Sequence, residues 1–570
     1  MRNLKQFLNK EFFKKAVFIV FILFLFFVNS LHESYPDEFD NILGGWFILH
    51  GKFPYVGFFT HHGPMPYFIA SIIEIFSGQS FVKFRMIYAL ALGVWFLFTY
   101  NILKKSVGEQ IVKFYLYFIV FVGFLSTYYW NHMLLADNIA AFTLLPAYGL
   151  IFLKDFLKKT ITLKDIILIS LLSVFALYSS LTYTYFYLIL IFYSLFLYYK
   201  NNLVSFKEVL NKKSFLPLII ILIPHLLLFF YFIVSSSFLD YMYQNFTFNI
   251  KYYVYNYPRS LESGHINPIR FAVVIANNFY NDFHALIAGF NLFNFGNPMN
   301  MTMALGNVGL IIYLLFKKNI KLAIFVFLLL IYANARSSPL KSGETDYQSA
   351  VYIFFSFFNI FFFLPEVFKE INEERELLKK IIFSVLFILV SFHSFFAFLY
   401  VVRKFNEKFF AKYMGTQSLI YDRPRLSPIV NLVTTKEDYA WIGPFNFEDL
   451  FYMNAKIPSK YHILIRGIGI SEKSRNEMLA DFKKNTPRII IFDKDFTYIT
   501  YQTYSYSGFF IKFLNENYLK LSDYREGSSS YFFPDATYPG NMAGKVFIRK
   551  DSIREVVEKL KERGYIKRAH

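Results

Sequence analysis

The sequence predicts a mainly α-helical protein: a polytopic membrane helix bundle followed by a small α/β domain at the C-terminal end. The 570 residues are 55% hydrophobic and 22% aromatic, with a mean hydropathy of +0.37, which is unusual for a soluble chain of this size. Apolar runs of about 20 residues, the length that crosses a bilayer, recur as far as residue 402 and then stop. The remaining tail alternates short apolar and amphipathic segments, as small α/β domains do.

Hydropathy places about 11 membrane spans in the first part of the chain. The first apolar run follows several lysines, as in a signal peptide, but no small-residue cleavage site comes after it. We therefore expect it to remain as an anchor. The predicted spans cover residues 16–31, 82–102, 111–129, 137–153, 164–180, 183–199, 215–234, 301–316, 321–334, 348–364 and 381–402.

Basic residues predict the orientation of these spans. Lys and Arg clusters, such as Lys104/Lys105, fall on every second connection, and short cytoplasmic connections carry an excess of these residues. The N-terminus is therefore predicted to be cytoplasmic and the tail extracytoplasmic, in an inner or plasma membrane. Three long outer connections result, at about 32–80, 235–300 and 335–347. Polar outer loops are where a membrane protein builds a site that meets water.

The predicted domains are a transmembrane domain over 1–402, which includes a first outer loop over 32–80, and an extracytoplasmic α/β domain over 403–570. Apolar residues at helical spacing from Phe39 to Phe47 and from Met65 to Phe76 predict two helices at the membrane surface. The tail elements predicted are strands at Ile489–Phe492 and Val546–Arg549 and helices at Glu472–Lys484, Gly508–Asn517 and Ser552–Arg563.

Composition also excludes several classes of function. The formal charge of +19 comes from basic residues spread between the hydrophobic segments, so nucleic acid is not predicted as a partner. The chain has no cysteine, which excludes disulfides and thiolate metal sites. It contains no glycine-rich phosphate loop, zinc-protease helix or serine elbow, so nucleotide-driven chemistry is disfavoured.

Three acidic residues are candidates for chemistry. Asp37 and Glu38 stand where the first surface helix begins, and acids after a proline are also ordinary at a helix start. A carboxylate there would alternatively serve as a general base for an acceptor hydroxyl. Asp137 lies where an outer turn meets the fourth span. An acid beside hydrocarbon usually has a polar partner and a function, and capping of the span is the alternative.

His61 and His62 are adjacent in the first outer loop. Paired histidines bind metals, but neighbouring side chains point in different directions and no third ligand is evident. A divalent metal is therefore not indicated, and no cofactor is predicted. Hydrogen bonding or phosphate contact fits these residues better, with solvated loop histidines as the alternative.

Positive charges on the predicted outer side are scarce, and a phosphate leaving group needs such charges. Arg85 stands at the head of the second span, where it would alternatively snorkel to the interface. The others would alternatively be solvated loop residues. These other outer cations are Arg259, Arg270, Arg336 and Lys341.

The first outer loop resembles a known family. The Asp-Glu pair, Gly44, the run Gly51–Tyr55 and the run His61–Tyr67 together resemble the first loop of membrane glycosyltransferases of the GT-C class. The nearest subset is like family 39, which is related to protein O-mannosyltransferases and to the lipid A aminoarabinose transferase. The resemblance covers roughly residues 15 to 150 well and the rest by layout.

Further positions extend this resemblance. Phe84-Arg85-Met86 is similar to the family's arginine at the head of span two, Asp137 to its second-loop aspartate, and Tyr347 to the entry into a late span. Many relatives carry a lysine near the outer end of the fifth or sixth span, whereas Tyr178–Tyr183 has no cation here. Phosphate binding must then fall to other residues, or the donor differs.

The resemblance implies an enzyme that moves a sugar, a hexose or a pentose, from a polyprenyl-phosphate donor to a hydroxyl of a glycan, lipid or protein. Transfer would occur at the outer face of the membrane, with inversion. Asp37 would be the base, with Glu38 beside it, and Asp137, His61 and His62 would hold the acceptor or orient the site. The implied ligands of the lipid phosphate are Arg85, Arg336, Lys341 and Tyr347.

Two other functions remain as alternatives. A lipid or polysaccharide transporter or flippase would be expected to show inverted repeats, broken helices and charges at mid-membrane depth, which the sequence does not display. A non-catalytic membrane scaffold with the tail as a binding module is the second. Replacement of Asp37 by Asn separates these alternatives from the enzyme.

Overall fold

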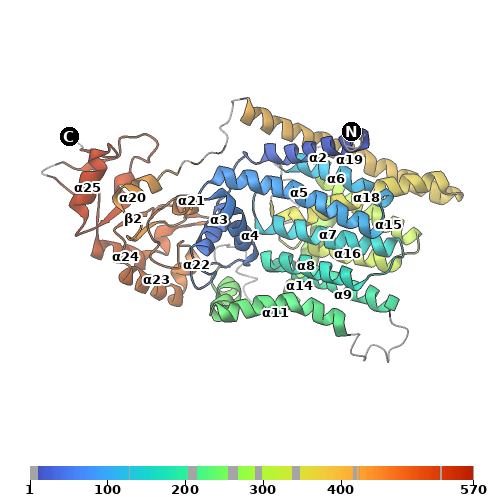
Figure 1. Ribbon diagram of the computed structural model, residues 1–570, viewed down its shortest axis with the longest axis horizontal. Helices are drawn as coiled ribbons and strands as arrows, with labels where there is room; N and C mark the ends of the chain where they lie inside the picture. Colours follow the sequence, from blue (N-terminus) through green and yellow to red (C-terminus); the bar gives the residue numbers. More distant parts are fainter. Residues whose placement is uncertain are drawn as a thin grey trace, which may run out of the picture.

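The computed structural model describes residues 10–126, 129–202, 215–253, 268–288, 298–336, 347–414, 420, 422, 424–526 and 529–568. Within these ranges the protein is mainly α-helical, and it consists of a helix bundle and a smaller α/β region at the C-terminal end (Figure 1). Two short helices, α3 (Pro36–Leu49) and α4 (Met65–Ser77), lie between the two parts (Figure 1).

Eight helices of the described ranges are long and apolar enough to cross a membrane, so the chain is a multi-pass membrane protein. Two of them, α9 and α18, are extended by the short turns η1 (Leu181–Tyr183) and η6 (Tyr347–Ser349). The eight helices are α2 (Lys10–Asn29), α5 (Phe81–Val107), α7 (Ala136–Phe156), α9 (Thr184–Asn202), α11 (Leu216–Val234), α15 (Pro298–Phe316), α18 (Ala350–Glu373) and α19 (Leu377–Tyr413).

The predicted count of about 11 spans exceeds these eight candidates. Each predicted segment coincides with a helix, but α6 (Glu109–Leu125), α8 (Leu163–Ser179) and α16 (Ile320–Ala333) have only 17, 17 and 14 residues. The last predicted span, 381–402, is the middle of α19, which continues to Tyr413. Its polar extension carries an i,i+4 ion pair between Arg403 and Glu407 at 2.8 Å, which favours continued helix.

Helix α7 lies at the centre of the bundle, since 89% of the residues in its apolar stretch are buried. A polar network crosses the interior beside it. Tyr148 of α7 donates a hydrogen bond to Asn359 of α18 at 2.6 Å, and Asn359 donates one to Asn307 of α15 at 2.8 Å. Asn307 in turn donates to Ser356 at 2.8 Å. These bonds satisfy polar groups that are costly to bury alone, and they fix three helices relative to one another.

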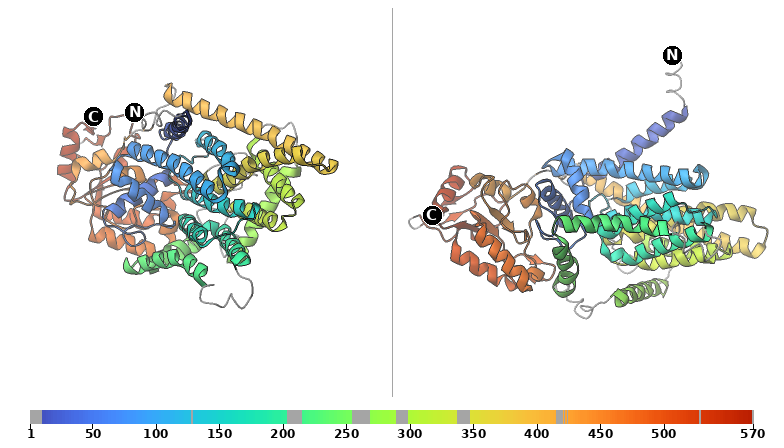
Figure 2. Two further views of the ribbon diagram at one scale, coloured as in Figure 1. Left: turned by 45° about the vertical axis from the view of Figure 1, so that its right-hand side comes forward. Right: turned by 60° about the horizontal axis from the view of Figure 1, so that its bottom comes forward.

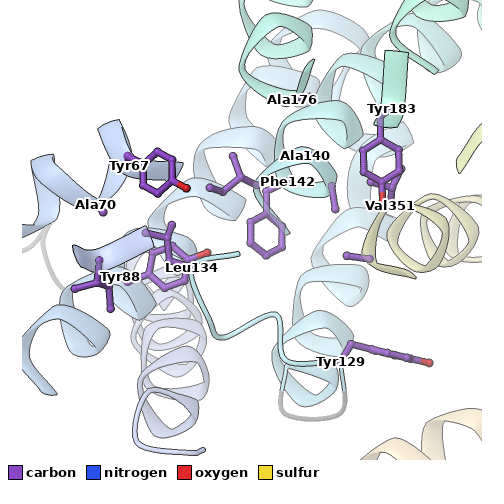
Figure 3. Close-up of a cluster of buried hydrophobic side chains, with 14 of the residues drawn as sticks. Tyr67, Ala70, Tyr88, Tyr129, Leu134, Ala140, Phe142, Ala176, Tyr183 and Val351 are labelled. Carbon is purple, nitrogen blue, oxygen red and sulfur yellow. The ribbon is translucent and has the colours of Figure 1, made fainter. Parts of the chain in front are cut away.

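The two helices predicted from Phe39 to Phe47 and from Met65 to Phe76 are confirmed as α3 and α4, with closely matching bounds. Their inner faces bury Ile42, Leu43 and Tyr67, and Figure 3 shows Tyr67 and Ala70 of α4 beside the bundle core. The outer face of α4 exposes Ile72 and Phe76, at 60% and 73%. An exposed apolar stripe of this kind suits a helix that lies against lipid.

The connection between α11 and α15 contains helices that hydropathy did not predict. Helix α14 lies at the edge of the bundle (Figure 2) and packs against α16. Polar residues interrupt the apolar positions of α14, so hydropathy does not predict it as a membrane span. The described part of this connection contains four helical elements: α12 (Phe238–Met242), the π-helix η3 (Tyr243–Phe248), α13 (Asn249–Lys251) and α14 (Pro268–Ala288).

The C-terminal region is built on a mixed four-stranded sheet in the order β1-β2-β7-β5. β1 and β2 are parallel, with Ala440 opposite Ile489, and the other pairs are antiparallel. The strands of this sheet are β1 (Ala440–Gly443), β2 (Ile489–Phe492), β5 (Tyr518–Lys520) and β7 (Val546–Arg549). Two small antiparallel pairs are β3 (Thr497–Tyr498) with β4 (Tyr501–Gln502) and β6 (Tyr531–Phe532) with β8 (Lys567–Arg568).

Helices cover this sheet through an aromatic core. The fully buried Trp441 contacts the rings of Phe482 and Phe510 at 5.5 and 5.2 Å between centroids. The elements predicted in the tail are confirmed as β2, β7, α23, α24 and α25. The helices are α20 (Ser427–Val433), α21 (Phe447–Phe451), α22 (Arg466–Ile470), α23 (Glu472–Lys484), α24 (Gly508–Asn517) and α25 (Ile553–Glu562).

Candidate functional site

A cavity of about 360 Å³ lies where the segment 32–80, the helix bundle and the C-terminal region meet. The bundle side contributes polar residues, and the C-terminal side contributes mostly apolar ones, including Phe445, Ile463 and Tyr498. A backbone hydrogen bond from Phe59 to the carbonyl of Lys460, at 2.8 Å, holds the two sides together. The wall of this cavity, which we name the junction cavity, is therefore shared between both parts of the protein.

Asp37 lines the junction cavity from the first turn of α3. Pro36 starts the helix, so the helix-start interpretation describes the position of Asp37 correctly. Its Oδ2 accepts a hydrogen bond of 2.7 Å from the hydroxyl of Tyr347. Burial raises the pKa of Asp37 above its usual value, although the Tyr347 hydrogen bond opposes that shift. A carboxyl with a raised pKa in a cavity is suited to accept a proton.

Asp40 is a second carboxylate of the junction cavity, and the sequence analysis did not single it out. Its oxygens accept a hydrogen bond from Tyr67 at 3.0 Å and contact Nε2 of His462 at 3.3 Å. Gly44 permits this arrangement, because a Cβ there would lie 2.2 Å from the Tyr67 ring. The sequence did contain a sign that Asp40 belongs to the site. It lies three residues after Asp37, and this i,i+3 spacing puts both acids on one face of a helix.

His61 and His62 line the same cavity. Their rings are 4.0 Å apart, and the His61 ring lies 4.1 Å from that of Tyr253. Burial lowers the pKa of both histidines, so near neutral pH they act as uncharged hydrogen-bonding groups. Gly63 comes directly after the two histidines. Only glycine fits there, because a Cβ at this position would lie 2.0 Å from the carbonyl oxygen of Tyr178.

Arg336 brings a positive charge to the junction cavity. Its Nε lies 3.6 Å from Oδ2 of Asp137. The Asp137 side chain is only 1% exposed and the Arg336 side chain is 26% exposed, so the buried acid anchors a cation that remains accessible. Asp137 thus contacts the site through Arg336 and does not itself line the cavity.

Glu38 and Arg85 form a separate, fully buried ion pair of 2.5 Å. Arg85 also donates a hydrogen bond to the carbonyl of Glu33 at 2.9 Å, and the second oxygen of Glu38 accepts one from the amide of Leu134 at 3.2 Å. Neither side chain lines the junction cavity. Charges that are satisfied in this way fasten α3 to α5 and to the loop before α7.

The structure therefore gathers five of the predicted site residues around one cavity: Asp37, His61, His62, Arg336 and Tyr347. Of the remaining predicted residues, Lys341 and Arg259 lie outside the described residues. Arg270 is near the start of α14 and does not line the cavity.

Most other residues that line the cavity were not predicted from the sequence, for example Tyr253 and Ile463, which come from distant parts of the chain. No local pattern marks them, because the fold alone brings them to the site. Among the described residues, no group of three His, Asp or Glu side chains is arranged to hold a metal ion. No protein-family model matches the chain, and no curated protein matches it either.

Proposed function

We propose that the protein is an integral membrane glycosyltransferase. It would transfer a hexose or pentose from a polyprenyl-phosphate donor to a hydroxyl of a glycan, lipid or protein. One observation carries the proposal: the half-buried carboxyl of Asp37 and the anchored cation Arg336 line the same cavity. A base and a cation that face one space are what displacement of a phosphate from a sugar requires.

Each step of the proposed reaction uses a residue of the junction cavity. Asp37 accepts the proton of the acceptor hydroxyl, whose oxygen forms the bond to the anomeric carbon. The bond between that carbon and the phosphate oxygen breaks, and the phosphate leaves with the electron pair. Arg336 neutralises the charge that develops on it. One base and one leaving-group cation imply inversion, by the same in-line logic as for inverting glycosidases.

The other predicted residues take supporting roles in this proposal. Tyr347 orients Asp37 through its hydrogen bond, and Asp137 orients Arg336. His61 and His62 contribute neutral hydrogen-bonding groups to acceptor binding. The family resemblance implied Glu38 as a neighbour of the base and Arg85 as a phosphate ligand. In this proposal both residues act by positioning the start of α3.

The proposal includes an eleven-span arrangement of the GT-C kind. Helices α6, α8 and α16 would cross the membrane beside α5, α7 and α18, against which they pack. Local thinning of the bilayer accommodates such short spans. The N-terminus would be cytoplasmic, because basic clusters fall on alternate connections. The junction cavity and the C-terminal region would then face the outside of the cell membrane, where polyprenyl-linked sugars are presented.

The decisive experiment compares two carboxylates of one cavity. Purified full-length protein is incubated with a panel of undecaprenyl-phosphate hexoses and pentoses and with membrane extract as the acceptor source. We expect Asp37→Asn to lower transfer by about 10²–10⁴-fold, the usual contribution of a general base. Asp40→Asn is the matched control, since Asp40 is already bonded to Tyr67 and His462, and we expect it to retain most of the rate.

Two results would contradict the proposal at different levels. Full transfer by Asp37→Asn would remove Asp37 as the base while leaving the activity in place. Failure of the wild-type protein to transfer any sugar of the panel would argue against the glycosyltransferase itself. Circular dichroism and size-exclusion profiles of both variants establish that the fold is retained.

A further inference from the structure

A second, smaller cavity of about 260 Å³ lies on Arg336. It is formed by α14 and by the end of α16, and Arg336 lines both this cavity and the junction cavity. Its polar wall consists of Asn278, Asn281, Asp282 and Asn334. Three carboxamides and one carboxylate thus surround a space that adjoins the proposed reaction centre.

Asn334 is the residue that points to a ligand. It is 5% exposed, and within the described part of the chain neither its Nδ2 nor its Oδ1 has a hydrogen-bond partner. A buried amide left unpaired costs about 1–3 kcal/mol, so buried polar groups normally have partners. A ligand that satisfies both atoms must both donate and accept hydrogen bonds.

Hydroxyl groups meet this requirement, whereas a phosphate or a prenyl chain does not. A phosphate accepts hydrogen bonds but would leave Oδ1 of Asn334 unpaired, and Asp282 would repel it. A prenyl chain would leave every polar group of the wall unpaired. At roughly 30 Å³ per water molecule, the cavity equals about nine waters, a volume that suits a single sugar ring.

We propose that this cavity holds the sugar ring of the donor, with Asn334 and the polar face of α14 reading its hydroxyl groups. The inference rests on the proposed function and adds the place where the sugar is recognised. The anomeric carbon would lie beside Arg336, which lines both cavities, while the ring hydroxyls extend toward α14. A site that hydrogen-bonds ring hydroxyls discriminates between sugars that differ in one hydroxyl position.

The test compares lipids with and without a sugar. Full-length protein in lipid nanodiscs is titrated with undecaprenyl phosphate and with the same lipid phosphate carrying single hexoses or pentoses. The preference is the ratio of Kd for the bare lipid to Kd for the best sugar-bearing lipid. We expect Asn334→Leu, which keeps the shape of the side chain, to reduce this preference about tenfold, corresponding to the loss of paired hydrogen bonds. Affinity for the bare lipid phosphate should stay within about twofold.

Asn278→Ala is the second variant, since Asn278 is exposed on α14 and its replacement does not endanger folding. We expect it to reduce the same preference. If both variants retain the full preference, or if Asn334→Leu weakens both lipids equally, the sugar pocket is wrong while the proposed transferase stands. If the wild-type protein binds neither lipid, the proposed function fails together with this inference.

Discussion

The hydroxyl of Tyr347 donates a hydrogen bond of 2.7 Å to Oδ2 of Asp37, although 310 residues separate the two positions. The bond joins the first turn of α3 to the turn that precedes α18. It stabilises the charged form of a carboxyl that burial otherwise pushes toward the neutral form. The pair therefore adjusts the pH at which the proposed base becomes active.

Tyr347→Phe removes this hydrogen bond and should raise the pKa of Asp37 further. A base works only when deprotonated, so the rate increases as pH rises through that pKa. We expect the acid limb of kcat/KM to move to higher pH in Tyr347→Phe, with the plateau rate less affected than the position of the limb. Transfer measured from pH 4 to 9 tests this, and an unmoved limb would mean that another group titrates.

Removal of one partner of the buried Glu38–Arg85 pair should destabilise the protein. A lone buried charge costs about 3–5 kcal/mol, so we expect Glu38→Gln or Arg85→Met to lower the unfolding free energy by that order. The double variant Glu38→Met/Arg85→Met should lower the unfolding free energy by less than the sum of the two single variants, because no unpaired charge remains. Unfolding in mild detergent with increasing SDS measures all three, and additive losses would show that the two charges are not coupled.

Glu74 should make stability depend on pH. The side chain is buried in α4, and neither carboxyl oxygen has a hydrogen-bond partner among the described residues. Burial raises the pKa of Glu74 to about 9, whereas it is near 4.3 in an unfolded chain. The folded protein thus holds a proton that the unfolded chain releases, so stability is greatest below about pH 4 and declines toward pH 9.

Glu74→Gln is neutral at every pH and should flatten this decline. Thermal unfolding at pH 5, 7 and 9 gives the comparison, with the exposed Glu516→Gln as the control. A wild-type Tm that is independent of pH, or an equally steep decline in Glu74→Gln, would rule out the buried neutral carboxyl.

Asn359→Leu should loosen the bundle. The substitution leaves the hydroxyl of Tyr148 and Oδ1 of Asn307 without the partner that Asn359 supplies, and we expect a loss of about 1–3 kcal/mol in unfolding free energy. Ser194→Ala is the matched control, because Ser194 is also buried but, within the described ranges, bonds only to the carbonyl of Ile191 in its own helix, at 2.8 Å. Equal losses in the two variants would show that the network across three helices adds no stability.

The sequence predicted those features that depend on local pattern. Apolar residues at helical spacing located α3 and α4, and short apolar runs located β2 and β7, because amphipathic period is a property of neighbouring residues. The number of membrane spans was harder to predict from the sequence than the positions of these elements. Hydropathy reports that a segment is apolar, whereas the end of α16 after 14 residues is set by the chain that follows it.

Within the candidate site, sequence reasoning selected residues but could not assign their partners. Asp37 and Glu38 are adjacent and chemically alike, yet one lines a cavity and the other is enclosed by Arg85. The contact of Asp40 with His462 spans 422 residues. Such separations are closed by packing of the whole chain, about which local spacing carries no information.

The shared wall of the junction cavity has a consequence for experiments that divide the protein. Phe445, Ile463 and Tyr498 belong to the C-terminal region and enclose the same space as Asp37. A truncation after α19 would open the proposed reaction centre to bulk water and so weaken every electrostatic interaction in it. Replacing the C-terminal region by another tail would exchange one wall of the chamber, and under the proposed function such chimaeras should change which acceptor is modified while the donor stays the same.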